Sequence, residues 1–135
     1  MDAVGKTINK IGNAQKHTAE DERAGNVLFA ITTDGMENAS REFGYGKIQQ
    51  MVEHQKSKYG WEFIFLGANI DAVATAVRFG IGKDRATNYN ADSAGTLLNY
   101  DVISETVSCL RASRPISENW KERIDEDFRK RYFDI

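Results

Sequence analysis

Apolar residues occur in two patterns along the chain, one typical of helices and one typical of strands. The first set lies among polar residues near the start, three or four positions apart: Val4, Ile8 and Ile11. This spacing predicts an amphipathic helix from Asp2 to about His17. Gly5 and Gly12 share one side of that helix, and each lowers helix stability by roughly 1 kcal/mol relative to alanine. We therefore expect the helix to pack unusually close to its neighbour.

Two continuous apolar runs predict strands. They are residues 27–33, VLFAITT, and residues 61–66, WEFIFL. Runs of this kind are typical of strands covered on both faces, so the first strand is expected in the centre of the sheet. A third, less apolar strand is expected around Arg85 to Tyr89, at a sheet edge.

Helical spacing between and after these strands predicts three further helices. One runs from near Tyr45 to Gly60, a short one is capped by Asp71 and ends before Gly80, and a longer one opens at Asp92. Strands and helices therefore alternate, which favours a parallel sheet with right-handed crossovers. The predicted fold class is α/β, a three-layer Rossmann-like sandwich with about three strands.

Pro115 separates these elements from a last predicted helix. Ser117 can cap this helix, whose apolar residues stand at every fourth position: Trp120, Ile124, Phe128 and Tyr132. This stripe belongs either to the core of the domain or to a face that binds a partner. We expect residues 115–135 to form a C-terminal amphipathic helix that extends a domain of residues 1–114.

Composition narrows the class of protein. Acidic residues exceed basic ones by two, and the basic residues are scattered except near Arg129 to Arg131, so no nucleic-acid partner is expected. The single cysteine, Cys109, cannot form an internal disulfide. The sequence has no apolar leader and no apolar stretch of about 20 residues. We expect a cytoplasmic protein that does not insert into a membrane.

Polar side chains follow each predicted strand. They form one pair at each strand end: Thr33 and Asp34, Asn69 and Asp71, Asn90 and Asp92. Ligands bind beyond the carboxyl ends of parallel strands, and oxygen atoms of this kind suit hard cations such as Mg²⁺ or Mn²⁺. The same residue types also shape turns and cap helices. The pattern is therefore compatible with a binding site or with a structural role.

Three segments resemble von Willebrand factor A-like domains. Residues 27–40, VLFAITTDGMENAS, resemble the strand and Thr-Asp-Gly loop of that family. Residues 61–72, WEFIFLGANIDA, and residues 86–111 resemble the last two strands and the last helix of a bacterial, intracellular branch. The resemblance covers about Asp2 to Ser113 and implies the carboxy-terminal half of such a domain.

This resemblance implies one element of a metal-ion-dependent adhesion site. Asp34 maps onto a metal position, which in the family usually touches the ion through water. The family's Asp-x-Ser-x-Ser loop and later threonine have no counterpart in this sequence. Hard cations need several oxygen ligands. We therefore expect no cofactor for this chain alone, and Mg²⁺ or Mn²⁺ binding at Asp34 when the missing loops are supplied.

The first functional hypothesis is a non-enzymatic protein-interaction module. Its expected binding rim surrounds Asp34 and consists of Thr33, Gly35, Glu37, Asn38, Asn69 and Asp71. The alternative is a divalent-metal-assisted phosphohydrolase in which Asp34, Glu37 and Asp71 hold the metal. A third reading is a structural fragment without a site.

The resemblance also bears on the expected partners. It implies that strand 27–33 lacks the neighbour that it has in the family, and an unpaired apolar strand invites association. We expect this edge to be covered by the same strand of a second copy in a homodimer, or by helix 117–132. A different protein is the alternative to a second copy as the partner of this chain.

Overall fold

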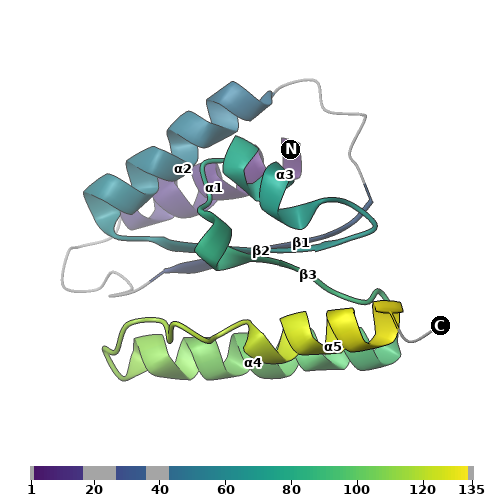
Figure 1. Ribbon diagram of the computed structural model, residues 1–135. Helices are drawn as coiled ribbons and strands as arrows, with labels where there is room; N and C mark the ends of the chain where they lie inside the picture. The colour runs from purple at the N-terminus through teal and green to yellow at the C-terminus, as the bar shows by residue number, and fades with distance from the viewer. Residues whose placement is uncertain (1, 17–26, 36–42, 134–135) are drawn as a thin grey trace.

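The computed structural model describes residues 2–16, 27–35 and 43–133, which form an α/β fold. One parallel sheet has the strand order β1-β2-β3: β1 (Leu28–Asp34), β2 (Glu62–Ala68) and β3 (Ala86–Asn88). One face is covered by α1 (Asp2–Lys16), α2 (Tyr45–Tyr59) and α3 (Ala72–Arg78), and the other by α4 (Ser93–Arg111) and α5 (Glu122–Phe133) (Figure 1). This is the predicted three-layer, Rossmann-like sandwich.

Local signals set several helix ends where the sequence predicts them. Gly60 ends α2 in the left-handed conformation, with φ of 67°. The carboxylate of Asp71 accepts a hydrogen bond from the Ala74 amide at 3.1 Å and caps α3. Asp92 caps α4 in the same way, from the Gly95 amide at 2.8 Å. The predicted caps are confirmed because each depends on residues next to it in sequence.

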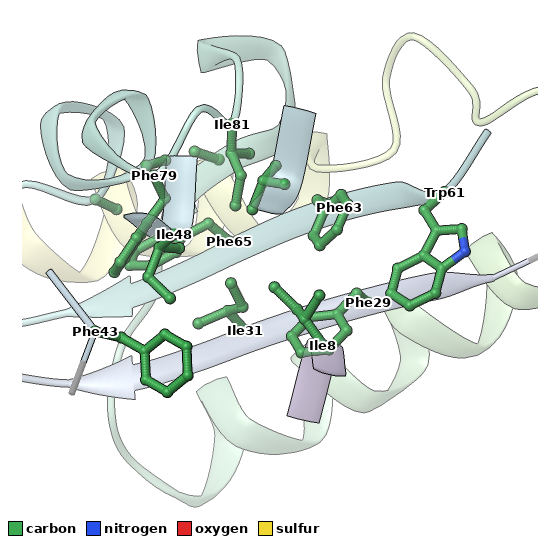
Figure 2. Packing of buried hydrophobic residues seen from close by; sticks show 14 residues of the cluster. Ile8, Phe29, Ile31, Phe43, Ile48, Trp61, Phe63, Phe65, Phe79 and Ile81 are labelled. Atoms are coloured by element: carbon green, nitrogen blue, oxygen red, sulfur yellow. The ribbon is translucent and has the colours of Figure 1, made fainter. Parts of the chain in front are cut away.

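The larger core lies between the sheet and the first helical layer. Figure 2 shows its side chains meeting from both sides: Phe29, Ile31, Phe63 and Phe65 from the strands, and Ile8, Ile48 and Phe79 from the helices or their ends. Trp61 is buried in the same cluster, as expected for a packing anchor. Burying residues of this size stabilises the fold by about 1.5–3 kcal/mol each.

Glycine allows α1 to lie close to the start of the second helical segment. A Cβ atom built at Gly5 would stand 2.3 Å from the Phe43 ring, closer than any real contact. The same atom at Gly12 would meet the Gln55 amide nitrogen at 3.3 Å. The predicted close packing of this helix is therefore confirmed.

The smaller core lies on the opposite face of the sheet. It joins Ile64 and Leu66 of β2 to Val102 of α4, and to Trp120 and Ile124 near the C-terminus. Trp120 and Ile124, the first half of the predicted stripe, thus belong to the core of the domain. Phe128 is half-buried, and the side chain of Tyr132 lies outside the described residues.

The position of β1 corrects one expectation. β2 is the central strand, and β1 lies at an edge. Phe29 and Ile31 are buried, whereas Ala30 and Thr32 are exposed, so β1 is not covered on both faces. The physical reason is that Phe29 and Ile31 pack into the larger core, while the small side chains of Ala30 and Thr32 on the opposite face stay exposed.

The start of α5 corrects a second expectation. The helix begins at Glu122, and the Ser117 hydroxyl donates to the Asn119 side chain at 2.6 Å instead of capping a helix. Some apolar helix residues, Tyr59, Val73, Val77 and Leu97, are exposed because they lie on helix faces that turn away from the sheet. No helix in the described ranges combines the length and the apolar character that a bilayer span needs.

Candidate functional site

The carboxyl ends of β1 and β2 meet at one edge of the sheet and bring two predicted rim residues together. Asp34 lies opposite Ala68 in the register of the strands. The Asn69 amide donates to the Asp34 carboxylate at 2.5 Å. Both residues are exposed. The sequence therefore places a carboxylate and an amide at the rim, as predicted from parallel strand ends.

The chain leaves both strands through left-handed conformations. Gly35 has φ of 97°, and Asn69 has φ of 61°, which few residues other than glycine and asparagine adopt. The Gly35 amide donates to the Ala68 carbonyl at 2.8 Å, and the Thr33 hydroxyl donates to the Gly35 carbonyl at 3.2 Å. These bonds fix the direction in which the Asp34 carboxylate projects.

Asp71 serves the helix that follows. Its carboxylate caps α3, and the side-chain oxygen of Asn88 accepts from the Ala72 amide at 3.0 Å beside it. The Asp71 carboxylate is thus engaged by backbone rather than shared with Asp34. Glu37 and Asn38, the two other predicted rim residues, lie outside the described residues.

Tyr89 is a rim neighbour that sequence reasoning missed. It follows β3 directly and is 7% exposed. Burial raises the pKa of its phenol above the ordinary value, and the negative charge of nearby Asp34 raises it further. Its place at the end of a parallel strand was a signal that could have found it.

The donors at this rim do not fit the divalent cation that the resemblance implies. Within residues 2–16, 27–35 and 43–133, no three His, Cys, Asp or Glu side chains stand together as a metal group. Asn69 turns an N–H donor toward Asp34, so it supplies no oxygen there. Among the described rim residues, the Asp34 carboxylate is thus the one oxygen ligand that the resemblance places at the metal position, and hard cations need several.

An apolar cavity opens beside the rim, between α1, β1 and α3. Its volume is about 290 Å³, and its walls include Val4, Ile31 and Phe79. Two predicted rim residues, Thr33 and Gly35, also line it. A hollow of this size and character suits an apolar side chain better than a phosphate group.

The outer edge of β1 is the second feature of the site. Two bonds set its backbone direction: the Glu62 amide donates to the Val27 carbonyl at 2.9 Å, and the Gly35 amide donates to Ala68. Strand residues alternate, so odd-numbered residues turn their N–H and C=O groups toward β2. The even-numbered residues, from Leu28 to Asp34, point these groups outward. In the described part of the chain, β2 is the one strand that pairs with β1.

The outer edge of β3 is covered instead. The ammonium group of Lys121 donates to the Ala86 carbonyl at 2.8 Å and to the Lys83 carbonyl at 3.1 Å. The Trp120 indole donates to the Asp84 carbonyl at 2.8 Å, and the Thr87 hydroxyl donates to the Asp125 carboxylate. α5 packs on β3 and α4. The expectation that helix 117–132 covers the edge of β1 is therefore wrong, because its polar and apolar partners lie at the other side of the sheet.

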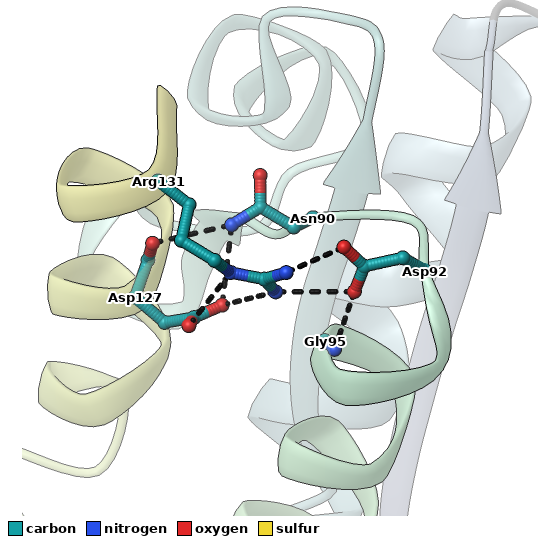
Figure 3. A network of polar contacts seen from close by, with 5 residues as sticks. All are labelled: Asn90, Asp92, Gly95, Asp127 and Arg131. Carbon is teal, nitrogen blue, oxygen red and sulfur yellow. Dashed lines mark hydrogen bonds and ion pairs between the residues drawn. The ribbon is translucent and has the colours of Figure 1, made fainter. Parts of the chain in front are cut away.

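An ionic network fixes α5 in this place (Figure 3). The Arg131 guanidinium pairs with Asp92 at 2.5 Å and with Asp127 at 2.8 Å, and the Asn90 amide donates to Asp127 at 3.1 Å. Hydrogen bonds from Arg131 hold the pKa of both carboxyls below the usual value, and they raise the pKa of Arg131. Asn90 and Asp92, the polar pair after β3, thus anchor a helix.

Comparisons of the chain with protein-family models, curated proteins and solved structures found no match. The likeness to von Willebrand factor A-like domains stays a prediction from residues 27–40, 61–72 and 86–111. The rim at Asp34 and the outer edge of β1 are the two features from which a function can be argued.

Proposed function

We propose that the chain is a non-enzymatic protein-interaction module that binds its partner by adding a strand to the outer edge of β1. The observation that carries this proposal is the difference between the two edges of the sheet. The β3 edge is covered by Lys121 and Trp120, whereas the β1 edge meets no strand in the described residues. Open edges of this kind accept strands from other chains.

The outer edge of β1 offers a regular row of backbone donors and acceptors. Leu28, Ala30, Thr32 and Asp34 point their N–H and C=O groups outward. Ala30 and Thr32 also expose their side chains, and both side chains are small. An added strand would satisfy these groups through main-chain bonds, each worth about 0.5–1.5 kcal/mol.

The rim supplies a second contact surface beside the strand edge. Asp34 ends the open strand and accepts a hydrogen bond from Asn69, while Thr33 and Gly35 line the apolar cavity beside it. The cavity has room for one apolar side chain of a bound protein. Specificity would then come from the rim and affinity from the backbone.

The phosphohydrolase alternative draws no support from the described residues. It requires Asp34, Glu37 and Asp71 to share a metal, but the Asp71 carboxylate caps α3. Glu37 lies outside the described residues. We therefore propose the interaction module alone.

A labelled synthetic peptide with the sequence of residues 27–34 tests strand addition. We expect fluorescence anisotropy to show that the wild-type chain binds it, and that Thr32→Pro weakens binding at least about tenfold. Proline removes an N–H that faces away from β2, so the ladder between β1 and β2 stays intact. Thr32→Val keeps this N–H and is the matched control.

The same experiment can contradict the proposal. Absence of peptide binding, or equal binding by the wild-type and proline variants, would remove strand addition as the mode of interaction. Circular dichroism and thermal unfolding show whether each variant retains the fold. A loss of binding is interpreted only for a variant that is folded.

A further inference from the structure

We propose that the strand taken up by β1 is β1 of a second copy of this chain, and that the α4 helices of the two copies pack together on the same face of the joined sheet. This inference rests on the proposed strand addition. The second copy occupies the edge of β1, and its α4 helix provides a second contact surface.

That surface is a stripe on α4, which we call the α4 flank and define as Thr96, Tyr100, Ile103 and Val107. Spacings of four, three and four residues place these side chains on one side of the helix. Tyr100 is 65% exposed, and Ile103 and Val107 are half-buried. An aromatic ring exposed to this degree beside two aliphatic residues is typical of a contact surface.

The α4 flank turns away from α5. Glu105 marks the side of α4 that meets α5, because its carboxylate pairs with Arg123 at 2.8 Å. Tyr100, Ile103 and Val107 lie nearly half a helical turn from Glu105. Since α5 lies beside α4 (Figure 1) and packs on β3, the flank, on the opposite side of α4, faces away from α5 and β3.

Packing confirms that β1 and the α4 flank adjoin the same core. Leu28 of β1 and Ile103 of α4 are both partly buried against the smaller core. The exposed side chains of Ala30 and Thr32 project from β1 on the same face as Leu28, because strand side chains alternate. A second copy at the edge of β1 would therefore also meet the flank, because both border the smaller core.

The charge pattern of the flank favours a second copy over a charged partner. Its four residues include no Asp, Glu, Lys or Arg, while the acids Asp101 and Glu105 lie on other sides of α4. Two identical surfaces can meet without like-charge repulsion when both are uncharged. A two-fold axis perpendicular to the sheet brings the surface against itself and keeps α4 of both copies on one face.

The two-fold axis also determines the register of the strands. It makes the two β1 strands antiparallel, and their outward groups belong to even-numbered residues. With the axis at Ile31, Ala30 lies opposite Thr32 and Leu28 lies opposite Asp34 of the other copy. The two Asp34 carboxylates then stand roughly 20 Å apart at the strand rise. This separation exceeds the screening length of about 8–10 Å at physiological salt.

A dimer of this kind carries two rims. Because the paired strands are antiparallel, the Asp34 ends point in opposite directions along the joined sheet. Each copy uses its own strand edge for the other copy, and each rim with its cavity stays open at an outer end. The module would thus present two identical binding rims at a fixed separation.

Multi-angle light scattering over a range of concentrations tests this inference. We expect the wild-type chain to reach twice its mass of 15.2 kDa, and Tyr100→Glu and Thr32→Pro each to raise the dissociation constant at least about tenfold. Leu97→Glu is the matched control. It adds the same charge on the same helix at a residue that is also 65% exposed, but it lies off the flank.

The outcomes separate this inference from the proposed function. A chain that stays monomeric at millimolar concentration overturns the second copy, while strand addition stands if the peptide still binds. If Leu97→Glu weakens the dimer as much as Tyr100→Glu, the α4 flank is not the contact. Failure of the peptide to bind removes both proposals together.

Discussion

Single residues decide how closely the layers of this molecule approach. Gly5 leaves no room for a side chain, because its added Cβ would stand 2.3 Å from the Phe43 ring. Gly12, on the same helix, has a single near neighbour, the end of the flexible Gln55 side chain at 3.3 Å. The two glycines have the same helix propensity but different surroundings, which separates the effect of packing from that of the backbone.

Alanine substitutions at these two glycines should act in opposite directions. We expect Gly5→Ala to lower the free energy of unfolding by about 1–3 kcal/mol, because the Phe43 ring must move. Gly12→Ala should raise it by roughly 0.5–1 kcal/mol, since Gln55 can turn aside and alanine favours a helix. Urea unfolding followed by circular dichroism measures both. Equal effects of the two substitutions would show that α1 does not lie against Phe43.

At the scale of elements, α5 is held by charged groups at its C-terminal end. Arg131 bonds both Asp92, which caps α4, and Asp127 on its own helix (Figure 3). Arg131 lowers the pKa of both carboxyls. The two groups therefore stabilise the folded protein only when they are ionised. This contribution is complete at a pH above 3.8, their unperturbed pKa, and is lost as the pH falls through the lower folded value.

Removal of this cation should alter the pH dependence of stability. We expect Arg131→Gln to be less stable than the wild type at pH 7 and the difference to shrink as the pH falls below about 4. Chemical unfolding of both proteins at pH 7 and at low pH measures the difference. A difference that grows on acidification would contradict the role of the two carboxylates. Arg129→Gln, on the same helix, is the control.

The elements also show which parts of the fold local sequence can predict. The ends of α2, α3 and α4 were predictable, because Gly60, Asp71 and Asp92 act on neighbouring backbone. The start of α5 was not. Ser117 has the right residue type for a cap, but Trp120 and Lys121 instead bond carbonyls more than thirty residues away. Such long-range competition leaves no local pattern.

At the scale of the whole molecule, the candidate site was predictable in part for the same reason. Asp34 and Asn69 meet because parallel strands end at one edge, a rule that sequence can apply. Tyr89 stands at the end of β3 and follows the same rule, and the cap of α3 that engages Asp71 was also predictable from neighbouring residues. The apolar run of residues 27–33 suggested a central strand, but composition does not reveal how many neighbours a strand has.

Within the described residues, the two edges of the sheet differ. The C-terminal segment covers β3, whereas no described strand pairs with the outer edge of β1. Open edges are a liability in a monomer, and they are ordinarily covered or interrupted by charge. The outward row of β1 carries one charged side chain, Asp34 at its end, while Leu28, Ala30 and Thr32 are uncharged. Under the proposed function, another chain completes the sheet at this edge.

Residue-resolved amide hydrogen exchange tests this claim most directly. The amides of Ile31 and Thr33 point toward β2 and should be protected under all conditions, whereas those of Ala30 and Thr32 point outward. We predict that Ala30 and Thr32 become protected as protein concentration rises or as the 27–34 peptide is added. Exchange at these two amides that stays fast under both conditions would contradict strand addition at β1.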